Sequence, residues 1–367
     1  MTDTPDDDRS SARLWCADWS KPMRWGVLIV ASVVITALLE QVHLPAALLL
    51  GPMAAAIAIA AMGGQISIPK PGFTAAQAIV GMMIAASMPL SIFGELAEDW
   101  PIFTIGVLSV VIAAGFLGWL MSRTKLFPGT TAIWGSSPGA AAAMTLMSES
   151  YGADMRLVAF MQYVRVVCCA LVATAVARFM GVDTSGTAVE TVWFPSVDWL
   201  AVIGTAAVAL ITAFIGQKLR VPGGPLLFPL FAGLALKMTG VMPLVLPPWL
   251  LALSYAGIGW GIGMRFTPDV VMHAASALPR VLLSTMTLIG ICGCFAAVLV
   301  HVTDIDPLSA YLATSPGGAD SVAIIAASTK VDVPFVMAMQ IARFLFVVIT
   351  GPATARLLSR TSPKERP

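Results

Sequence analysis

Two arginines lie where a charge is costly, and their neighbours suggest what they bind. Arg165 and Arg343 each lie about ten positions into an otherwise apolar segment. A charge at that depth in a membrane costs roughly 2.5–3.5 kcal/mol or more unless it is paired or hydrated. Gln162 and Gln340 lie one helical turn earlier on the same faces. These groups could clamp a carboxylate or another anion. Alternatively, each guanidinium satisfies backbone carbonyls that a nearby break in the chain exposes, and the two roles can coexist.

A Ser-Pro-Gly sequence begins 25 residues before each glutamine, at Ser137 and at Ser315. Proline removes a backbone donor and stops a helix, whereas glycine permits unusual backbone angles and the close approach of a ligand. The N–H groups freed at the start of the following half-helix would form an anion site, with the serine as its cap. A single break is commonly a packing kink, but two at equivalent positions favour a function. The candidate substrate-binding residues are Ser137, Pro138, Gly139, Gln162, Arg165, Ser315, Pro316, Gly317, Gly318, Gln340 and Arg343.

Three aspartates near these sequences have different expected roles. Asp320 follows the second break, and the first half has Ala142 at the equivalent position. Asp320 is therefore a candidate for binding a coupled proton or cation, with a structural role facing a cavity as the alternative. Asp154 and Asp332 each lie eleven residues before an arginine. We predict that they mark helix starts, where a carboxylate satisfies free N–H groups and complements the helix dipole.

Histidines and cysteines form no metal-binding pattern in this sequence. The three histidines lie far apart, and no pair has the spacing of helical ligands. The cysteine pairs lie inside apolar segments, where small packing residues are expected. We therefore predict no metal site, no cofactor and no enzymatic activity. The histidines and paired cysteines in question are His43, His273, His301, Cys168, Cys169, Cys292 and Cys294.

The composition indicates a membrane protein. Of 367 residues, 58% are hydrophobic and only 11% are charged, whereas soluble domains carry about 25% charged residues. The net charge is +1 and no basic domain is separate from the apolar part, so we expect no nucleic-acid partner. The expected partners are the lipid bilayer and a small-molecule or ion substrate. The oligomeric state stays open, with a homodimer as one alternative.

Twelve apolar segments recur along the chain, and the longer ones match a hydrocarbon core of about 30 Å. They predict an all-α polytopic membrane protein. The segments are 24–40, 44–63, 74–93, 101–122, 129–148, 156–179, 200–216, 223–241, 249–264, 281–300, 307–328 and 333–355.

The two halves of the chain repeat one another at an offset of 178 residues. The order Ser-Pro-Gly-x-Ala, twelve residues, Asp, then Val-x-x-Met-Gln-x-x-Arg occurs in 137–165 and in 315–343, and Gly81 matches Gly259. So many shared polar positions argue against chance and predict two homologous repeats of six segments. The predicted organisation is a cytoplasmic tail (1–23), repeat 1 (24–180), a linker (181–199), repeat 2 (200–358) and a second cytoplasmic tail (359–367).

The distribution of lysine and arginine favours one topology, because cytoplasmic loops are enriched in both. If all twelve segments cross, these residues divide 13 inside to 6 outside. If the two Pro-Gly segments enter and leave on the same side, the division is 16 to 3. The re-entrant topology gives five crossings per repeat, so the second repeat is inverted; crossing segments would leave the repeats parallel. We expect a bacterial cytoplasmic membrane protein with both termini inside and residues 94–100 and 301–307 outside.

The duplicated unit GWLMSRTKLFPGTTAIWGSSPGAAAAMTLMSESYGADMRLVAFMQYVRVV, around the first break, resembles the repeat of the bacterial AbrB-type membrane protein family, often labelled ammonia monooxygenase. The resemblance covers about 24–358. The family is similar in layout to transporters of the cation:proton antiporter and anion transporter group, which implies transport without naming a substrate. Family repeats commonly carry an acid after Pro-Gly-Gly. Here the second repeat has Asp320-Ser321 and the first has Ala142-Ala143, so an acidic role would be asymmetric.

Three functions fit these observations. A secondary transporter of a small anionic metabolite, coupled to a proton or cation, fits the duplicated breaks and arginines. A membrane-embedded regulator of gene expression without transport is the alternative. A membrane monooxygenase fits least, because it would need metal ligands that the sequence does not group together. Substrate, coupling ion and direction of transport are not encoded in any pattern that we find.

Overall fold

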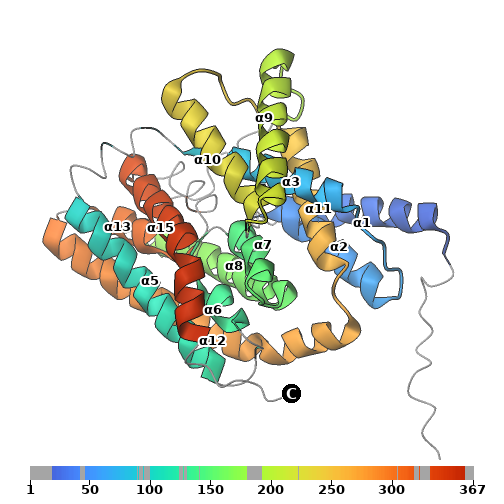
Figure 1. Cartoon of the computed structure of the whole chain (residues 1–367). Coiled ribbons are helices and arrows are strands. Elements are labelled where there is room, and N and C mark those ends of the chain that lie inside the picture. Colours follow the sequence, from blue (N-terminus) through green and yellow to red (C-terminus); the bar gives the residue numbers. More distant parts are fainter. Residues whose placement is uncertain are drawn as a thin grey trace, which may run out of the picture.

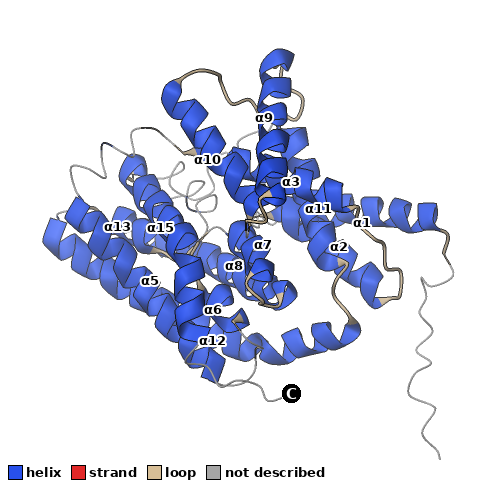
Figure 2. Ribbon diagram, viewed as in Figure 1, coloured by secondary structure: helices blue, strands red, loops and turns tan. Residues whose placement is uncertain are grey.

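The computed structural model describes residues 19–41, 46–88, 90, 94, 100–123, 127, 130–139, 141–179, 192–221, 223–303, 305–317, 322 and 331–359. Over these residues the chain forms helices and loops and no strand (Figure 2). The helices are α1 (Lys21–Gln41), α2 (Ala47–Ala61), α3 (Lys70–Ser87), α5 (Trp100–Arg123), α6 (Thr131–Ser136), α7 (Ala141–Ser150), α8 (Met155–Phe179), α9 (Trp199–Lys218), α10 (Gly224–Thr239), α11 (Pro248–Gly263), α12 (Pro268–Thr303), α13 (Pro307–Thr314) and α15 (Val333–Ser359).

The prediction of an all-helical membrane protein is confirmed. Six helices are long and apolar enough to cross a membrane: α1, α5, α9, α12 and the apolar parts of α8 and α15. Each of the twelve predicted segments overlaps at least one of the helices above. One difference is α12, which begins at Pro268 and so extends well before the predicted segment 281–300. Pro279 lies inside α12, and Figure 1 shows the helix bending along its length, as expected at an internal proline.

Local sequence signals explain several helix ends. Asp198 precedes α9 and accepts a hydrogen bond from a backbone N–H of its first turn. Asp306 does the same for α13, and Pro307 follows it at the first helical position, where the missing N–H of proline costs nothing. These caps satisfy N–H groups that a helix cannot pair internally.

The helices pack into two bundles, and each bundle takes helices from both halves of the chain (Figure 1). The break-free bundle contains α1, α2, α3, α9, α10 and α11; the break bundle contains α5, α6, α7, α8, α12, α13 and α15. Within the first, α3 packs on α10 and α11 packs on α2; within the second, α5 packs on α15 and α12 packs on α8. The packing units therefore interleave the two sequence repeats.

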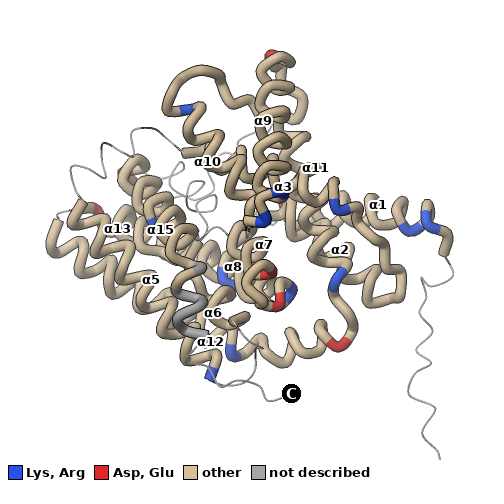
Figure 3. The backbone as a smooth tube through the Cα atoms, in the orientation of Figure 1, with Lys and Arg blue, Asp and Glu red and all other residues tan. Residues whose placement is uncertain are grey.

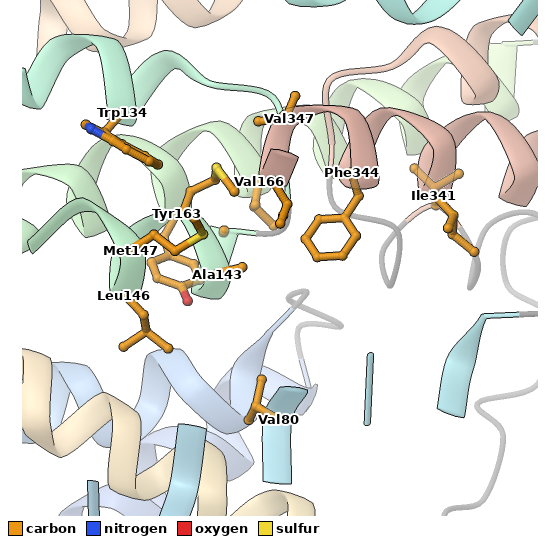
Figure 4. Packing of buried hydrophobic residues seen from close by; sticks show 14 of the residues in the cluster. Val80, Trp134, Ala143, Leu146, Met147, Tyr163, Val166, Ile341, Phe344 and Val347 are labelled. Atoms are coloured by element: carbon orange, nitrogen blue, oxygen red, sulfur yellow. The ribbon is translucent and has the colours of Figure 1, made fainter. Parts of the chain in front are cut away.

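An apolar core joins the two bundles. Val80 of α3 belongs to the same cluster of buried side chains as Leu146 and Met147 of α7 and Phe344 of α15 (Figure 4). Helices α8 and α11 are also in contact across this boundary. The bundles are thus two packed units with a shared apolar interface.

Equivalent helices of the two halves, α3 and α11, run antiparallel where they touch. Gly261 near the end of α11 lies against the ring of Phe73 near the start of α3. Earlier in α11, the hydroxyl of Tyr255 donates to Sδ of Met83, toward the end of α3, at 3.2 Å. The start of one helix therefore lies beside the end of its counterpart.

Two glycines let the helices of the break-free bundle approach closely. Gly81 of α3 lies against the backbone carbonyl of Leu226 in α10. Gly259 of α11 lies against that of Leu49 in α2, where an added Cβ would be 2.8 Å from the oxygen. Small residues allow such backbone contact between membrane helices. Since the two glycines are 178 residues apart, the same contact occurs at equivalent positions.

The surface suits a lipid environment, and the arginine-bearing helices are enclosed. Large apolar side chains such as Ile105, Leu200 and Leu283 are 70–80% exposed. Charged residues in the described parts lie mainly near helix ends (Figure 3). By contrast, 61% of the apolar window of α8 and 56% of that of α15 is buried, against 11% for α1. Arg165 and Arg343 thus lie on the central helices of the break bundle.

Candidate functional site

Each Pro-Gly segment returns to the place where it starts. The backbone N–H of Asp154, after the first segment, donates to Oγ1 of Thr131 at its beginning, at 3.0 Å. The N–H of Asp332, after the second segment, donates to Oγ of Ser309 at 2.9 Å. The ring of Trp134 also stacks on Tyr151, with centroids 5.3 Å apart. One hydroxyl–amide contact therefore closes both segments at equivalent positions.

The serines of the Ser-Pro-Gly sequences end the preceding half-helices. Ser137 is the C-terminal boundary of α6, and both its N–H and its hydroxyl donate to the carbonyl of Ile133. Ser315 ends α13, and its N–H donates to the carbonyl of Tyr311 at 2.8 Å. We expected each serine to cap the following half-helix. The observed bonds place both serines at the end of the helix before the break, because a residue that precedes proline is disfavoured in the helical conformation: ψ is 125° at Ser137 and 132° at Ser315.

Gln162 and Arg165 of α8 close the carbonyl end of α6. The Gln162 amide donates to the carbonyls of Trp134 at 2.8 Å and Ser137 at 3.0 Å. Arg165 donates to the carbonyls of Ser136 at 3.1 Å and Ser137 at 2.8 Å, and also to the Gln162 side-chain oxygen at 2.5 Å. The arginine therefore serves the backbone of its own repeat.

Gln340 and Arg343 of α15 repeat this arrangement at the end of α13. The Gln340 amide donates to the carbonyls of Leu312 at 2.7 Å and Ser315 at 3.2 Å. Arg343 donates to the carbonyls of Ser315 at 2.8 Å and Gly317 at 3.1 Å, and to the Gln340 side-chain oxygen. A helix end carries free carbonyls and a partial negative charge, so a cation there is stabilising.

These bonds leave part of each guanidinium unused. Arg165 and Arg343 are 2% and 3% exposed, and Nε of each has no hydrogen-bond partner within the described residues. The ion pairs found in that part of the chain join Arg156 to Asp154 and Arg265 to Glu149. Neither buried arginine thus has a carboxylate partner there. A cavity of about 20 Å³, enough for one water, lies beside Arg165.

The two breaks converge on one region of the break bundle. Helix α8, which carries Arg165, contacts α13, the helix that precedes the second break. Gly317 of the second break backs onto Cys169 of α8, where an added Cβ would be 3.2 Å from the cysteine Cβ. Cys169 lies one helical turn after Arg165, so the second break packs beside the helix whose side chains bind the first break.

The remaining predicted site residues have these positions. Pro138, Gly139, Pro316 and Gly317 are buried at the breaks, and the Gly139 N–H donates to the Ser137 carbonyl at 3.1 Å. Gly318 and Asp320 lie outside the described residues.

Asp154 and Asp332 lie directly before α8 and α15, as predicted for helix starts. The Asp154 carboxylate accepts hydrogen bonds from the N–H and side chain of Arg156, and the Asp332 carboxylate accepts one from the N–H of Phe335. Burial raises the pKa of Asp154, but its bonds to Arg156 outweigh this and hold the pKa below its ordinary value. The carboxylate is therefore ionised at neutral pH.

Comparison with known proteins places the chain in a family. The family model described as "Transition state regulatory protein AbrB" matches residues 48–359. The chain belongs to the AbrB family. It is 44% identical over 343 residues to "Putative regulator AbrB" of Escherichia coli K12, covering 93% of this chain and 98% of that protein. It is 25% identical over 302 residues to "Uncharacterized protein YhjN" of Bacillus subtilis 168, covering 77% of each. The AbrB-type resemblance seen in the repeats is confirmed.

A second feature of this AbrB-family chain went unnoticed in the sequence. A crevice of about 640 Å³ opens between the two bundles, lined by the start of α3, the end of α7, the α9–α10 loop and the end of α11. Its charged lining residues are Lys70, Arg220, Arg265 and Glu149. They come from four separate elements. The only hint in the sequence that they lie together is that the re-entrant topology puts all four on the same side of the membrane.

Thr131 and Ser309 were missed as well. They occupy equivalent positions and are both hydroxyl residues, but neither belongs to the quoted motif. Their contacts with Asp154 and Asp332 could have been inferred only by aligning the repeats further upstream.

Proposed function

We propose that this AbrB-family protein is a secondary transporter of a small anionic metabolite in the bacterial cytoplasmic membrane. One observation carries the proposal: the second break packs against the arginine-bearing helix of the first repeat, and each repeat brings a buried arginine with an unused Nε donor. A cationic region of this kind, enclosed in apolar helices, is stabilised by an anion. Interrupted segments meeting inside the membrane are typical of secondary transporters.

The antiparallel contact of α3 and α11 supports an inverted repeat. Two parallel repeats would place equivalent helices in the same direction, whereas Phe73 and Gly261 lie together at opposite ends of theirs. The interleaved bundles give such a protein two units that can move against each other. Alternating access commonly uses movement of this type around a fixed site.

Contacts at both ends of the break-free bundle support the re-entrant topology. Lys70 and Arg220 line one crevice, but a topology with twelve crossings puts them on opposite sides. The ammonium of Lys237 donates to the carbonyls of Ala86 and Met88, at 2.5 Å each, which that topology would also separate. In the re-entrant topology each pair lies on one side, Lys70 and Arg220 inside and Lys237 outside.

The depth of the breaks agrees with this arrangement. α6 and α7 on either side of the first break have six and ten residues, and α13 before the second break has eight, so they span about 9 Å, 15 Å and 12 Å at 1.5 Å per residue. Since the hydrocarbon core is about 30 Å thick, each of these half-helices is too short to cross it. The breaks would then lie where a transported ion changes side.

We assign proton or cation coupling to Asp320, the acid that one repeat alone carries. Asp320 follows the second Pro-Gly sequence in an apolar part of the chain, and an unpaired carboxylate inside a membrane binds a proton. Asp320→Asn imitates the protonated form, so it should remove the pH dependence of transport while the protein still inserts. Transport by Asp320→Asn equal to wild type at every pH would contradict this assignment.

The transport proposal is tested in two steps. A thermal-shift screen of the purified protein against carboxylates, amino acids and cations identifies a ligand. Flux of that ligand is then measured in proteoliposomes with an imposed pH or Na⁺ gradient. We expect an anion to stabilise the protein and to be taken up. Stabilisation without flux under any gradient would instead favour a membrane-embedded regulator, in line with the word "regulator" in the name of the Escherichia coli relative.

A further inference from the structure

We propose that the crevice between the two bundles is a binding site for a small organic dianion, entered from the cytoplasm. The role of this site in transport rests on the proposed function. The choice of a dianion as ligand rests on the residues that line the crevice. The volume of about 640 Å³ lies within the range of ordinary small-molecule sites. Sites of this kind occur preferentially at interfaces between packed units and between helices of bundles.

The charge of the crevice selects the ligand. Lys70, Arg220 and Arg265 supply three cations, and Glu149 supplies one carboxylate, which leaves a formal charge of +2 on the lining. A dianion balances this charge, whereas a cation would be repelled. Arginine and lysine form charge-assisted hydrogen bonds with carboxylate and phosphate groups.

The rest of the lining suits a short carbon skeleton. Ile66, Ile68, Phe73 and Met264 offer apolar surface, and Gln77 offers an amide. The Arg265 guanidinium also lies 5.8 Å from the centroid of the Phe73 ring. The crevice thus combines acid-binding groups with a surface for carbon atoms, which an inorganic ion would not use.

The backbone at Arg220 is held in an unfavourable conformation at this crevice. Its φ is +53°, in the left-handed region where glycine is preferred. The surrounding hydrogen bonds, Arg220 N–H to Gln217 and Val221 N–H to Gly216, form the helix ending that usually carries glycine. An arginine at this position costs backbone energy, as groups retained for binding often do.

The crevice reaches the broken segment. Glu149 and Ser150 at the end of α7 line it, and Glu149 pairs with Arg265 of the other bundle. The N–H of Gly223 donates to the hydroxyl of Ser150 at 3.4 Å, also between the bundles. An incoming dianion therefore competes with Glu149 for Arg265. Binding of the ligand would release a contact that holds the bundles together, which couples occupancy to bundle movement.

The test compares variants with opposite expected effects. The full-length protein is placed in phosphatidylcholine nanodiscs, and succinate and glycerol 3-phosphate are titrated by calorimetry at constant ionic strength. We expect both dianions to bind and neutral dimethyl succinate not to bind. Lys70→Gln and Arg220→Asn should each weaken binding about tenfold, because each loses one charge-assisted contact. Asparagine tolerates the left-handed conformation, so Arg220→Asn removes the charge without adding strain.

Glu149→Gln should tighten binding about threefold or more, because it removes the competing carboxylate. Lys218→Asn is the matched control: this exposed lysine lies two residues from Arg220 but does not line the crevice. Equal affinities for all variants, or no binding of either dianion to wild type, would overturn the proposal. So would block of both dianions by added phosphatidylglycerol, because the crevice would then hold a lipid headgroup.

The two proposals fail in distinguishable ways. Calorimetric binding that depends on Lys70 and Arg220, without flux in proteoliposomes, leaves the crevice site and removes the transport function. Flux with an unchanged KM in Lys70→Gln and Arg220→Asn leaves the transport function and removes the crevice site.

Discussion

At the scale of single residues, the two Gln-Arg pairs explain how this chain keeps charge inside apolar helices. Arg165 and Arg343 each donate to carbonyls at the end of a half-helix, where a proline has ended the internal bonding. The glutamine holds the guanidinium in place through its side-chain oxygen. This structural role accounts for two of the three guanidinium nitrogens and leaves Nε for a ligand or water.

We expect Arg165→Ala and Arg343→Ala to reduce thermal stability and to abolish ligand-induced stabilisation. Arg165→Ala leaves the Ser136 carbonyl without a side-chain donor, and Arg343→Ala does the same to Gly317. An unsatisfied buried group costs about 1–3 kcal/mol. Arg123→Ala is the control, because that arginine is exposed and stacks on Trp119. A wild-type ligand response in both variants would leave the arginines a structural role alone.

At the scale of elements, a hydrogen bond joins the two ends of each broken segment, and the glycine contacts align the helices of the break-free bundle. The hydroxyl–amide bonds from Thr131 and Ser309 fix where each segment returns. Gly81 and Gly259 fix how α3 and α11 sit on helices of the other half. The hydrogen bond and the glycine contact each occur once in each repeat, so each can be tested by the same substitution at the two equivalent positions.

The topology is tested by labelling single cysteines in intact cells, in a variant without the native cysteines. We expect Lys70→Cys and Arg220→Cys to be protected from an impermeant maleimide and Lys237→Cys to react with it. The physical reason is that contacts in the fold place the first two on one side and Lys237 on the other. A cysteine near 303 should also react from outside. Opposite labelling of Lys70→Cys and Arg220→Cys would contradict the re-entrant topology.

Enlarging the close-contact glycines should disrupt helix pairing. Gly81→Val and Gly259→Val force a side chain into a neighbouring backbone, and overpacking costs about 1–3 kcal/mol. Gly115→Val in α5 is the control, because a Cβ there meets no atom within 4 Å. Thermal unfolding in detergent should show destabilisation for the first two variants only. Similar stability for all three would mean that α3 and α11 can shift without cost.

At the scale of the whole molecule, the protein consists of two bundles, each built from helices of both repeats, with a charged crevice at their boundary. The Glu149–Arg265 ion pair crosses this boundary. Both partners are roughly half exposed, at 49% and 42%, and exposed pairs are worth little. The contact can therefore be exchanged for a ligand without a large energetic cost.

Bridging the two bundles should stop transport. Glu149→Cys together with Arg265→Cys, joined by a bifunctional methanethiosulfonate reagent, would link α7 to the end of α11. We expect flux to fall to background and to recover with dithiothreitol, because bundle movement is blocked. Each single variant treated with the same reagent is the control. Full flux in the bridged protein would show that the bundles do not move during transport.

The sequence by itself determined the helical content, and its repeated pattern drew attention to the two breaks. Hydrophobic segments of membrane length predict helices directly, because backbone N–H and C=O groups in lipid must form their hydrogen bonds within the segment. Arg165 and Arg343 could be singled out as site candidates because a charge inside an apolar segment is costly unless it is paired or hydrated. The Ser-Pro-Gly sequences were informative because two of them shared one offset.

Only the tertiary structure decided how those parts combine. The sequence left open whether each arginine binds a ligand or the backbone of its own repeat. In the structure Arg165 donates to the Ser137 carbonyl and Arg343 donates to the Ser315 carbonyl, each within its own repeat. Ser137 ends α6 instead of starting α7, because its N–H and its hydroxyl both donate back to the Ile133 carbonyl. The crevice joins Lys70, Arg220 and Arg265 from distant elements. Such groupings arise from helix packing between halves of the chain, and packing partners are not encoded in any local pattern.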